Sequence, residues 1–150
     1  MLRIYVDADV LIAGLLSQSE HGAANVVLQL SEATILDAVS SERAISEARR
    51  NLRTHIDNPE AKALLDDAID AALDVVPNPP AAACEDLGPV ADSKDLLHVA
   101  AAVEQGCSHL VTYNLRDYPP QYSGEPVDDL SVVTPGSLVR RIRARLSNLA

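Results

Sequence analysis

The feature that most constrains the fold is the alternation of short apolar segments with helical patterns along the whole chain. Residues 3–7 and 109–112, for example, are short apolar runs that end in a polar side chain, which is typical of strands. The segments between the predicted strands place apolar residues at helical spacing. This alternation predicts an α/β sandwich in which helices flank a central, mostly parallel sheet.

Local start and stop signals divide the chain further. Ser40-Ser41, Asn58-Pro59 and Thr134-Pro135 are helix start signals, and Gly106 is a helix stop. The predicted strands are 3–7, 33–39, 73–76, 109–112 and 130–133, and the predicted helices are 10–16, 21–30, 42–52, 59–72, 92–105 and the segment after 135. Residues 77–89 are rich in proline and are interpreted as a surface loop, too short to separate domains. We therefore expect one domain over residues 1–150.

Charge and composition limit the functions to be considered. The net charge of −10 has the wrong sign for broad electrostatic binding of nucleic acid, so either the substrate is not a polyanion or local basic groups and bound cations reverse the field. With four Tyr, no Phe and no Trp, an aromatic platform for stacking bases is not expected. Cys84 and Cys107 form no metal-binding or disulfide pattern, and no segment has the length of a membrane span. We expect no membrane association, inert cysteines and a cytoplasmic location.

Acidic and polar side chains follow the predicted strands. Asp7 ends the first strand, whereas Thr112, Asn114 and Asp117 follow a later one, and Asp95 lies in the first turn of the preceding helix. In open α/β sheets, ligands bind beyond the carboxyl ends of the strands. Carboxylates that converge there repel one another unless a proton or a cation neutralises them. Oxygen ligands suit Mg²⁺ or Mn²⁺, and such a site is typical of phosphoryl transfer or phosphodiester cleavage.

Five segments, taken in order, make the chain resemble the PIN-domain family, and in particular the VapC-like ribonuclease toxins of toxin–antitoxin pairs. The segments are YVDADVL at 5–11, SSERAISEARRNL at 40–52, residues 92–102, GCSHLVTYNLRDY at 106–118, and VVTP at 132–135. The resemblance spans roughly the whole chain and implies the PIN-like three-layer sandwich. It also implies metal-dependent endoribonuclease activity, in which metal-activated water attacks the phosphorus atom.

The same resemblance assigns the site residues. It gives Asp7, Glu47, Asp95 and Asp117 as the catalytic residues and the ligands of one or two Mg²⁺ or Mn²⁺ ions. Supporting positions are Asp9, Asp92, Thr112 and Asn114, and candidate RNA contacts are Arg49, Arg50 and Arg116. The chain departs from the family at two positions, because Asp9 stands where Asn is common and Asn114 stands where many relatives have an acid. The fourth ligand is therefore Asp117 or Asn114, and Asp117 is favoured.

Several of these residues also have a purely structural interpretation. Asp7 and Asp95 are also suited to the first turns of helices, and His98 is expected to be a structural histidine. Arg49 and Arg50 fit a solvated helix face as well as an RNA contact, and the arginines at 140, 141, 143 and 145 are expected to be solvated.

Two other functions remain open at this point. Because Asn114 stands where many relatives have an acid, the chain could instead be a non-catalytic PIN-fold module that binds RNA or protein. The motif Asp7-Ala8-Asp9-Val10 also resembles the haloacid-dehalogenase-like phosphatases, with Asp7 as the nucleophile and Asp9 as the acid/base. That family requires a downstream lysine, and no lysine follows Thr112. By the toxin resemblance, the expected partners are an RNA substrate, a cognate antitoxin with a segment that fills the acidic groove, and a second copy of the chain.

Overall fold

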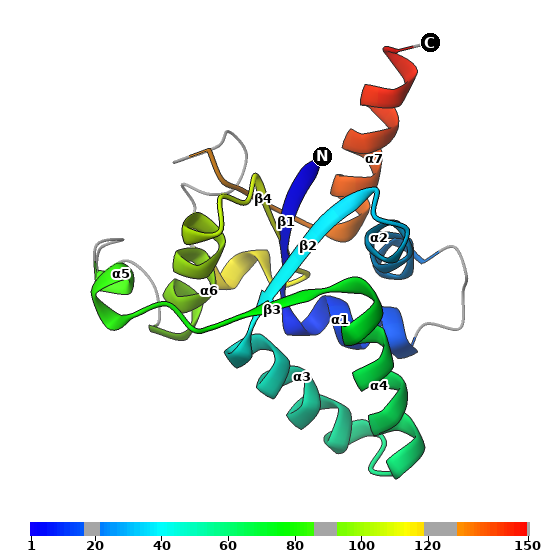
Figure 1. The fold of residues 1–150 in the computed structure, drawn as a ribbon, viewed down its shortest axis with the longest axis vertical. Helices are drawn as coiled ribbons and strands as arrows, with labels where there is room; N and C mark the ends of the chain where they lie inside the picture. Colours follow the sequence, from blue (N-terminus) through cyan, green and yellow to red (C-terminus); the bar gives the residue numbers. More distant parts are fainter. Residues whose placement is uncertain (17–21, 86–92, 119–128, 150) are drawn as a thin grey trace.

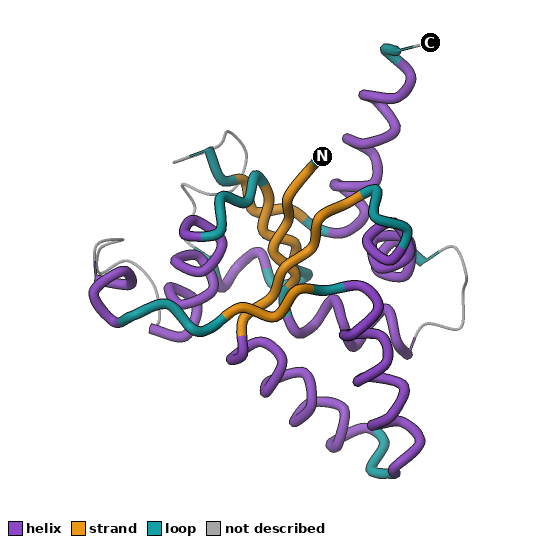
Figure 2. Tube along the Cα trace, in the orientation of Figure 1, coloured by secondary structure: helices purple, strands orange, loops and turns teal. Residues whose placement is uncertain are grey.

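Five short strands form one parallel sheet at the centre of the protein (Figures 1 and 2). The computed structural model describes residues 1–16, 22–85, 93–118 and 129–149. The strands are β1 (Leu2–Val6), β2 (Leu36–Ser41), β3 (Asp74–Val76), β4 (His109–Val111) and β5 (Ser131–Val133), in the order β3-β2-β1-β4-β5. Every pairing between these strands is parallel, so the predicted mostly parallel sheet is confirmed. The carboxyl ends of all five strands consequently meet at one edge.

Helices cover both faces of the sheet (Figure 1). They are α1 (Ala8–Leu16), α2 (Ala23–Glu32), α3 (Glu42–His55), α4 (Pro59–Ala72), α5 (Ala81–Glu85), α6 (Ser93–Glu104) and α7 (Pro135–Ser147), with a 3-10 turn, η1, at Leu115–Asp117. Ile4 and Val6 point into an apolar cluster with α1, α2, α4 and α7, whereas Tyr5 points to the opposite face and packs with α6. The predicted three-layer sandwich is confirmed. None of the described helices is both long and apolar enough to cross a membrane.

The helix start and stop signals predicted from the sequence lie at helix ends in the structure. The side chains of Ser41, Asn58 and Thr134 each accept a hydrogen bond from a backbone N–H in the first turn of the helix that follows. These bonds satisfy donors that would otherwise have no partner inside the helix. Gly106 follows α6 with φ of +67°, a left-handed conformation that favours glycine. The helix after β2 therefore starts at a fixed position, which places Glu47 one turn inside it.

Two predicted boundaries are wrong. Residues 77–89 do not form a loop throughout, because Ala81–Glu85 is a short helix that packs on α6. Its three consecutive alanines have the highest helix propensity of any residue type, and Pro80 precedes them. The strand expected at 33–39 begins only at Leu36, because Thr34 adopts a left-handed turn with φ of 60°.

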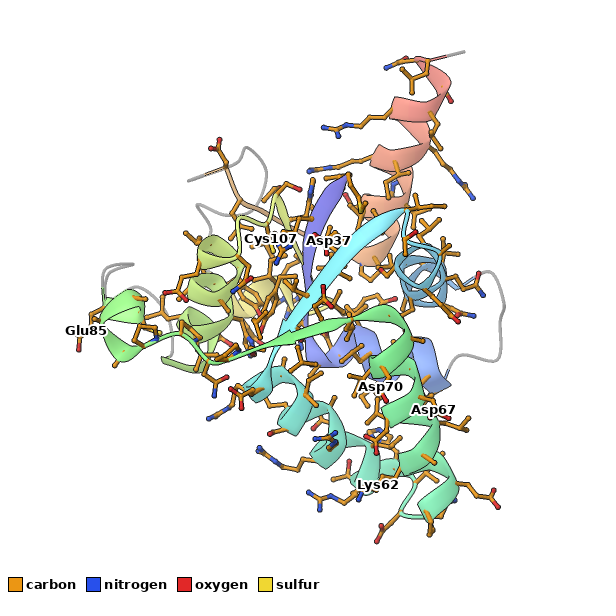
Figure 3. The ribbon with its side chains drawn as sticks, in the orientation of Figure 1. Asp37, Lys62, Asp67, Asp70, Glu85 and Cys107 are labelled. Atoms are coloured by element: carbon orange, nitrogen blue, oxygen red, sulfur yellow. The ribbon has the colours of Figure 1, made fainter. Side chains whose placement is uncertain are left out.

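The amino ends of the strands form the other edge of the sheet. Figure 3 shows Asp37 of β2 and Cys107, which precedes β4, at this end. Asp37 accepts a hydrogen bond of 2.7 Å from Arg3 of β1. Burial raises the pKa of the Cys107 thiol to about 11, so the reactive thiolate is scarce at neutral pH.

A candidate metal centre at the carboxyl edge of the sheet

A cavity of about 240 Å³ lies at the carboxyl edge of the sheet, and all four predicted catalytic carboxylates line it. Asp7 follows β1, Glu47 belongs to α3, Asp95 to the first turn of α6, and Asp117 to η1. Three of these elements, β1, α3 and α6, meet around the carboxyl ends of β1 and β2, which explains how Asp7 and Asp95, 88 positions apart in sequence, share one cavity.

Asp7 is buried and is fixed by several hydrogen bonds. It is only 7% exposed, and its Oδ1 accepts a hydrogen bond of 2.7 Å from the backbone N–H of Ala8. Its Oδ2 accepts bonds of 2.9 Å from the hydroxyls of Thr112 and Tyr118. Burial first, and then the charge of Asp7, raise the pKa of Tyr118 well above its usual value, so Tyr118 stays a donor. Both Asp7 oxygens thus have a defined orientation.

Asp9 is held beside Asp7 at an electrostatic cost. Its Oδ2 accepts a hydrogen bond of 3.0 Å from the backbone N–H of Tyr113 and lies 3.3 Å from the Thr112 hydroxyl. Burial and the neighbouring charge of Asp7 nevertheless raise the pKa of Asp9 to about 6. The two carboxylates therefore favour a proton or a cation between or beside them.

Glu47 is oriented by a chain of buried polar groups. Its Oε2 lies 3.4 Å from His98 Nε2, and His98 Nδ1 lies 2.6 Å from the hydroxyl of Tyr5. The Tyr5 hydroxyl is in turn 2.8 Å from Ser41 Oγ, the cap of α3. On its other side, Glu47 Oε1 accepts a hydrogen bond of 3.1 Å from Arg43 Nε. The contact with His98 and the Arg43 guanidinium lower the pKa of Glu47, so this carboxylate is ionised.

His98 therefore contacts a predicted metal ligand, Glu47, whereas the sequence predicts only a structural histidine. Burial disfavours its charged form, but the bond to Glu47 and the charges of Asp7, Glu47 and Asp95 outweigh burial and raise the pKa of His98. Asp7, Glu47 and His98 each offer one ligand atom, and these atoms lie within 4.8 Å of one another. Since both ring nitrogens of His98 already have partners, its contacts suit a residue that orients Glu47.

The remaining predicted positions divide into three groups. Asn114 and Asp117 both line the cavity, so both remain candidates for the fourth ligand. Arg50 also lines the cavity, whereas Arg49 pairs with Asp66 of α4 at 3.2 Å and Arg116 lies exposed in η1. Asp92 lies outside the described residues.

Sequence reasoning missed the roles of Arg43 and Tyr118 in this site. Arg43 precedes Glu47 by one helical turn, a spacing that places both side chains on one face, so this contact was available from the sequence. Tyr118 reaches Asp7 because η1 folds its segment back over the strand ends, and no local pattern signals that turn.

The comparisons with known proteins agree with this architecture. The family model described as "PIN domain" matches residues 3–116. No curated protein sequence matches the chain. The fold is similar to that of VapBC2 from Rickettsia felis, solved bound to a DNA fragment from their promoter, with a TM-score of 0.61 and 14% identity over 89% of this chain and 98% of that one.

Two further solved structures share the fold. Mycobacterium tuberculosis VapC20, described as a Sarcin-Ricin loop cleaving toxin, has a TM-score of 0.51 and 17% identity over 71% of this chain and 86% of that one. PAE2754 from Pyrobaculum aerophilum has a TM-score of 0.62 and 19% identity over 95% of this chain and 90% of that one. The family match covers the strands and helices that carry Asp7, Glu47 and Asp95. Because it assigns these residues to a different family from the haloacid-dehalogenase-like phosphatases, it removes the phosphatase alternative. On this match, the chain belongs to the PIN-domain family.

Proposed function

We propose that this protein is a metal-dependent endoribonuclease that hydrolyses RNA phosphodiester bonds. The observation that carries the proposal is the convergence of Asp7, Glu47, Asp95 and Asp117 on one cavity, with Asp9 beside them. A relative with the same fold, VapC20, is described as a toxin that cleaves the Sarcin-Ricin loop, which supports RNA as the substrate class.

The residues of the cavity fit a divalent cation. The donor set is dominated by carboxylate oxygens, which Mg²⁺ and Mn²⁺ prefer. Burial and the charge of Asp7 raise the pKa of Asp9, so a cation beside these two carboxylates would favour their ionised forms. Asp7, Glu47 and Asp95 would hold the ion, and Asp117 or Asn114 would complete its ligands. When bound, such an ion activates water for attack on phosphorus and stabilises the leaving oxygen.

The protein's own groups then have distinct tasks. Thr112 and Tyr118 hold Asp7 in one orientation, and His98 with Arg43 does the same for Glu47. Arg50 lines the cavity and would bind a phosphate oxygen of the substrate, since a guanidinium pairs well with that group. This preorganisation means that the acids do not have to rearrange when the substrate binds.

The direct test is cleavage of labelled single-stranded RNA by the purified protein with Mg²⁺, with Mn²⁺ and with a chelator. Asp7→Asn should abolish both the cleavage and the binding of Mn²⁺. Asp67→Asn is the matched control, because it removes one carboxylate from the exposed surface of α4, away from the cavity (Figure 3). Cleavage that persists in chelator or in Asp7→Asn would refute the proposal. Mn²⁺ binding with no cleavage of any RNA tested would favour the non-catalytic module.

We also propose that the nuclease is the toxin of a toxin–antitoxin pair, acts in the cytoplasm and forms a homodimer. The fold shared with VapBC2 and the VapC20 toxin supports this extension. Induced expression of the wild type should arrest bacterial growth, whereas Asp7→Asn should not. Light scattering on the purified protein measures the oligomeric state. Unimpaired growth with active enzyme present would contradict the toxin assignment while leaving the nuclease assignment intact.

A further inference from the structure

A second cavity, of about 420 Å³, lies at the opposite edge of the sheet, where the amino ends of β4 and β5 meet α7. Its polar lining consists of Ser108, His109, Asp129, Ser131, Arg141 and Arg145. Asp7 and Glu47 do not contribute to it, because parallel strands separate the two ends of the sheet. The cavity is therefore distinct from the candidate metal centre.

Two arginines of α7, Arg141 and Arg145, line this cavity together. Arg3, Arg43 and Arg49 each pair with a carboxylate, but neither Arg141 nor Arg145 has one within 4.0 Å among the described residues. Asp129 is the one acid in the described lining, and it too lies beyond ion-pair distance of both. The two guanidinium groups lie one helical turn apart on the same face of α7, a spacing that suits carboxylate-like or phosphate-like oxygens.

The contacts of Arg141 fix the state of the neighbouring groups. Its Nη1 lies 3.4 Å from His109 Nε2 and 3.3 Å from Ser131 Oγ. Since a guanidinium only donates, His109 Nε2 is the acceptor and the proton of the neutral ring sits on Nδ1. Nδ1 then donates to Ser108 Oγ at 2.8 Å, and Ser108 donates to the backbone carbonyl of Arg3 at 3.3 Å. Burial and the charges of Arg141 and Arg145 lower the pKa of His109, which agrees with a neutral ring.

We propose that this cavity binds a phosphate group through Arg141 and Arg145. A phosphate would supply the negative charge that no described carboxylate brings within 4.0 Å of these two guanidinium groups, and its oxygens would accept hydrogen bonds from their planar arrays of N–H donors. The Ser131 hydroxyl accepts a hydrogen bond from the Arg141 guanidinium and helps to orient it beside the cavity. The phosphate comes either from solution or from an RNA backbone that passes this end of the protein. The proposal does not rest on nuclease activity.

The test is a calorimetric and NMR titration of the full chain in chelator. Inorganic phosphate is one probe, and a short 5′-phosphorylated RNA is the other, added to the Asp7→Asn variant to prevent cleavage. Arg141→Gln combined with Arg145→Gln should lower the affinity at least about tenfold, because two charge-assisted contacts are lost. Arg143→Gln is the matched control on the same helix, outside the lining, and should change the affinity less than about twofold.

The imidazole resonances of His109 report where the phosphate binds, since His109 contacts Arg141. Shifts of His109 with both probes support the proposal and identify free phosphate as a sufficient ligand. Shifts with RNA alone support it and identify the RNA backbone as the source. The proposal is overturned if neither probe shifts His109 at tens of millimolar, or if Arg143→Gln weakens binding as much as the double variant does. Because no readout involves cleavage, these outcomes are independent of the proposed nuclease.

Discussion

Replacing Asp9 by Asn should stabilise the metal-free protein at neutral pH. Burial and the adjacent charge of Asp7 raise the pKa of Asp9 from 3.8 to about 6. The folded protein therefore holds this proton more tightly than the unfolded chain does. As the pH rises from 3.8 to about 6, the unfolded chain releases the proton first, so folding stability is lost. Above about pH 6 the folded protein bears the full free-energy cost of the ionised Asp9 side chain, and replacement by Asn removes this cost.

The magnitude follows from the two pKa values. The gap between 3.8 and about 6 corresponds to at most about 3 kcal/mol. Asp9 is partly exposed, so solvent screening reduces this figure, and we expect about 1–2 kcal/mol. The Asn side-chain oxygen still accepts the N–H of Tyr113, and Thr112 still donates to Asp7 at 2.9 Å. The substitution therefore leaves the Tyr113 N–H and the Thr112 hydroxyl with acceptors, and the thermal unfolding midpoint should rise by about 2–8 °C.

Urea unfolding in chelator between pH 4 and pH 8 measures the effect. The difference between Asp9→Asn and the wild type should be largest above pH 7 and should vanish near pH 4. The control variant Asp67→Asn, at an exposed position on α4, should show neither the gain nor its pH dependence. An Asp9→Asn protein that is no more stable at pH 7.5, or equally stabilised at both ends of the range, would refute the reasoning.

Three further outcomes can be measured on single variants. Glu47→Gln and Asp95→Asn should each lower the initial rate of RNA cleavage at least ~100-fold, and a near-wild-type rate would remove that residue from the proposed metal ligands. Tyr118→Phe deletes the 2.9 Å bond to the Asp7 carboxylate and should cost about 1.5–3 kcal/mol of stability in urea, whereas an unchanged midpoint would show that the bond contributes nothing. Gly106→Ala should cost about 1–2 kcal/mol, because an added Cβ has open space but φ is +67°; a neutral variant would contradict that cause.

The sequence predicts the frame of this protein because its signals are local. Alternating apolar segments give the parallel sheet, and the edge rule for such sheets then brings Asp7 and Asp95 together without further information. Glu47 was placed through the family resemblance alone, since an acid in a helix carries no signal of its own. The caps at Ser41 and Asn58 are equally local, and each holds in the structure.

What the sequence does not predict are the contacts between distant segments. His98 lies 51 positions after Glu47, and only the packing of α6 against β1 and β2 brings its ring to that carboxylate. The chain from Ser41 through Tyr5 to His98 joins three elements through buried hydroxyl and imidazole groups. A histidine on an apolar helix face gives the same pattern whether its partner is a core hydroxyl or a catalytic acid. Its role therefore depends on tertiary geometry.

The balance of charge in the acidic cavity decides whether the fold alone can hold these groups together. Asp7, Asp9, Glu47, Asp95 and Asp117 face two guanidinium groups, one of which already pairs with Glu47. The helices α1, α3 and α6 begin near this edge, and each N-terminus carries about half a positive charge, worth about 0.3–1 kcal/mol to an anion. In their presence, burial and the charge of Asp7 still raise the pKa of Asp9 to about 6. A divalent cation brings about four times the charge of one helix end to the same place. The fold therefore positions the acids, and under the proposed function a bound divalent cation would remove the remaining electrostatic cost of an ionised Asp9.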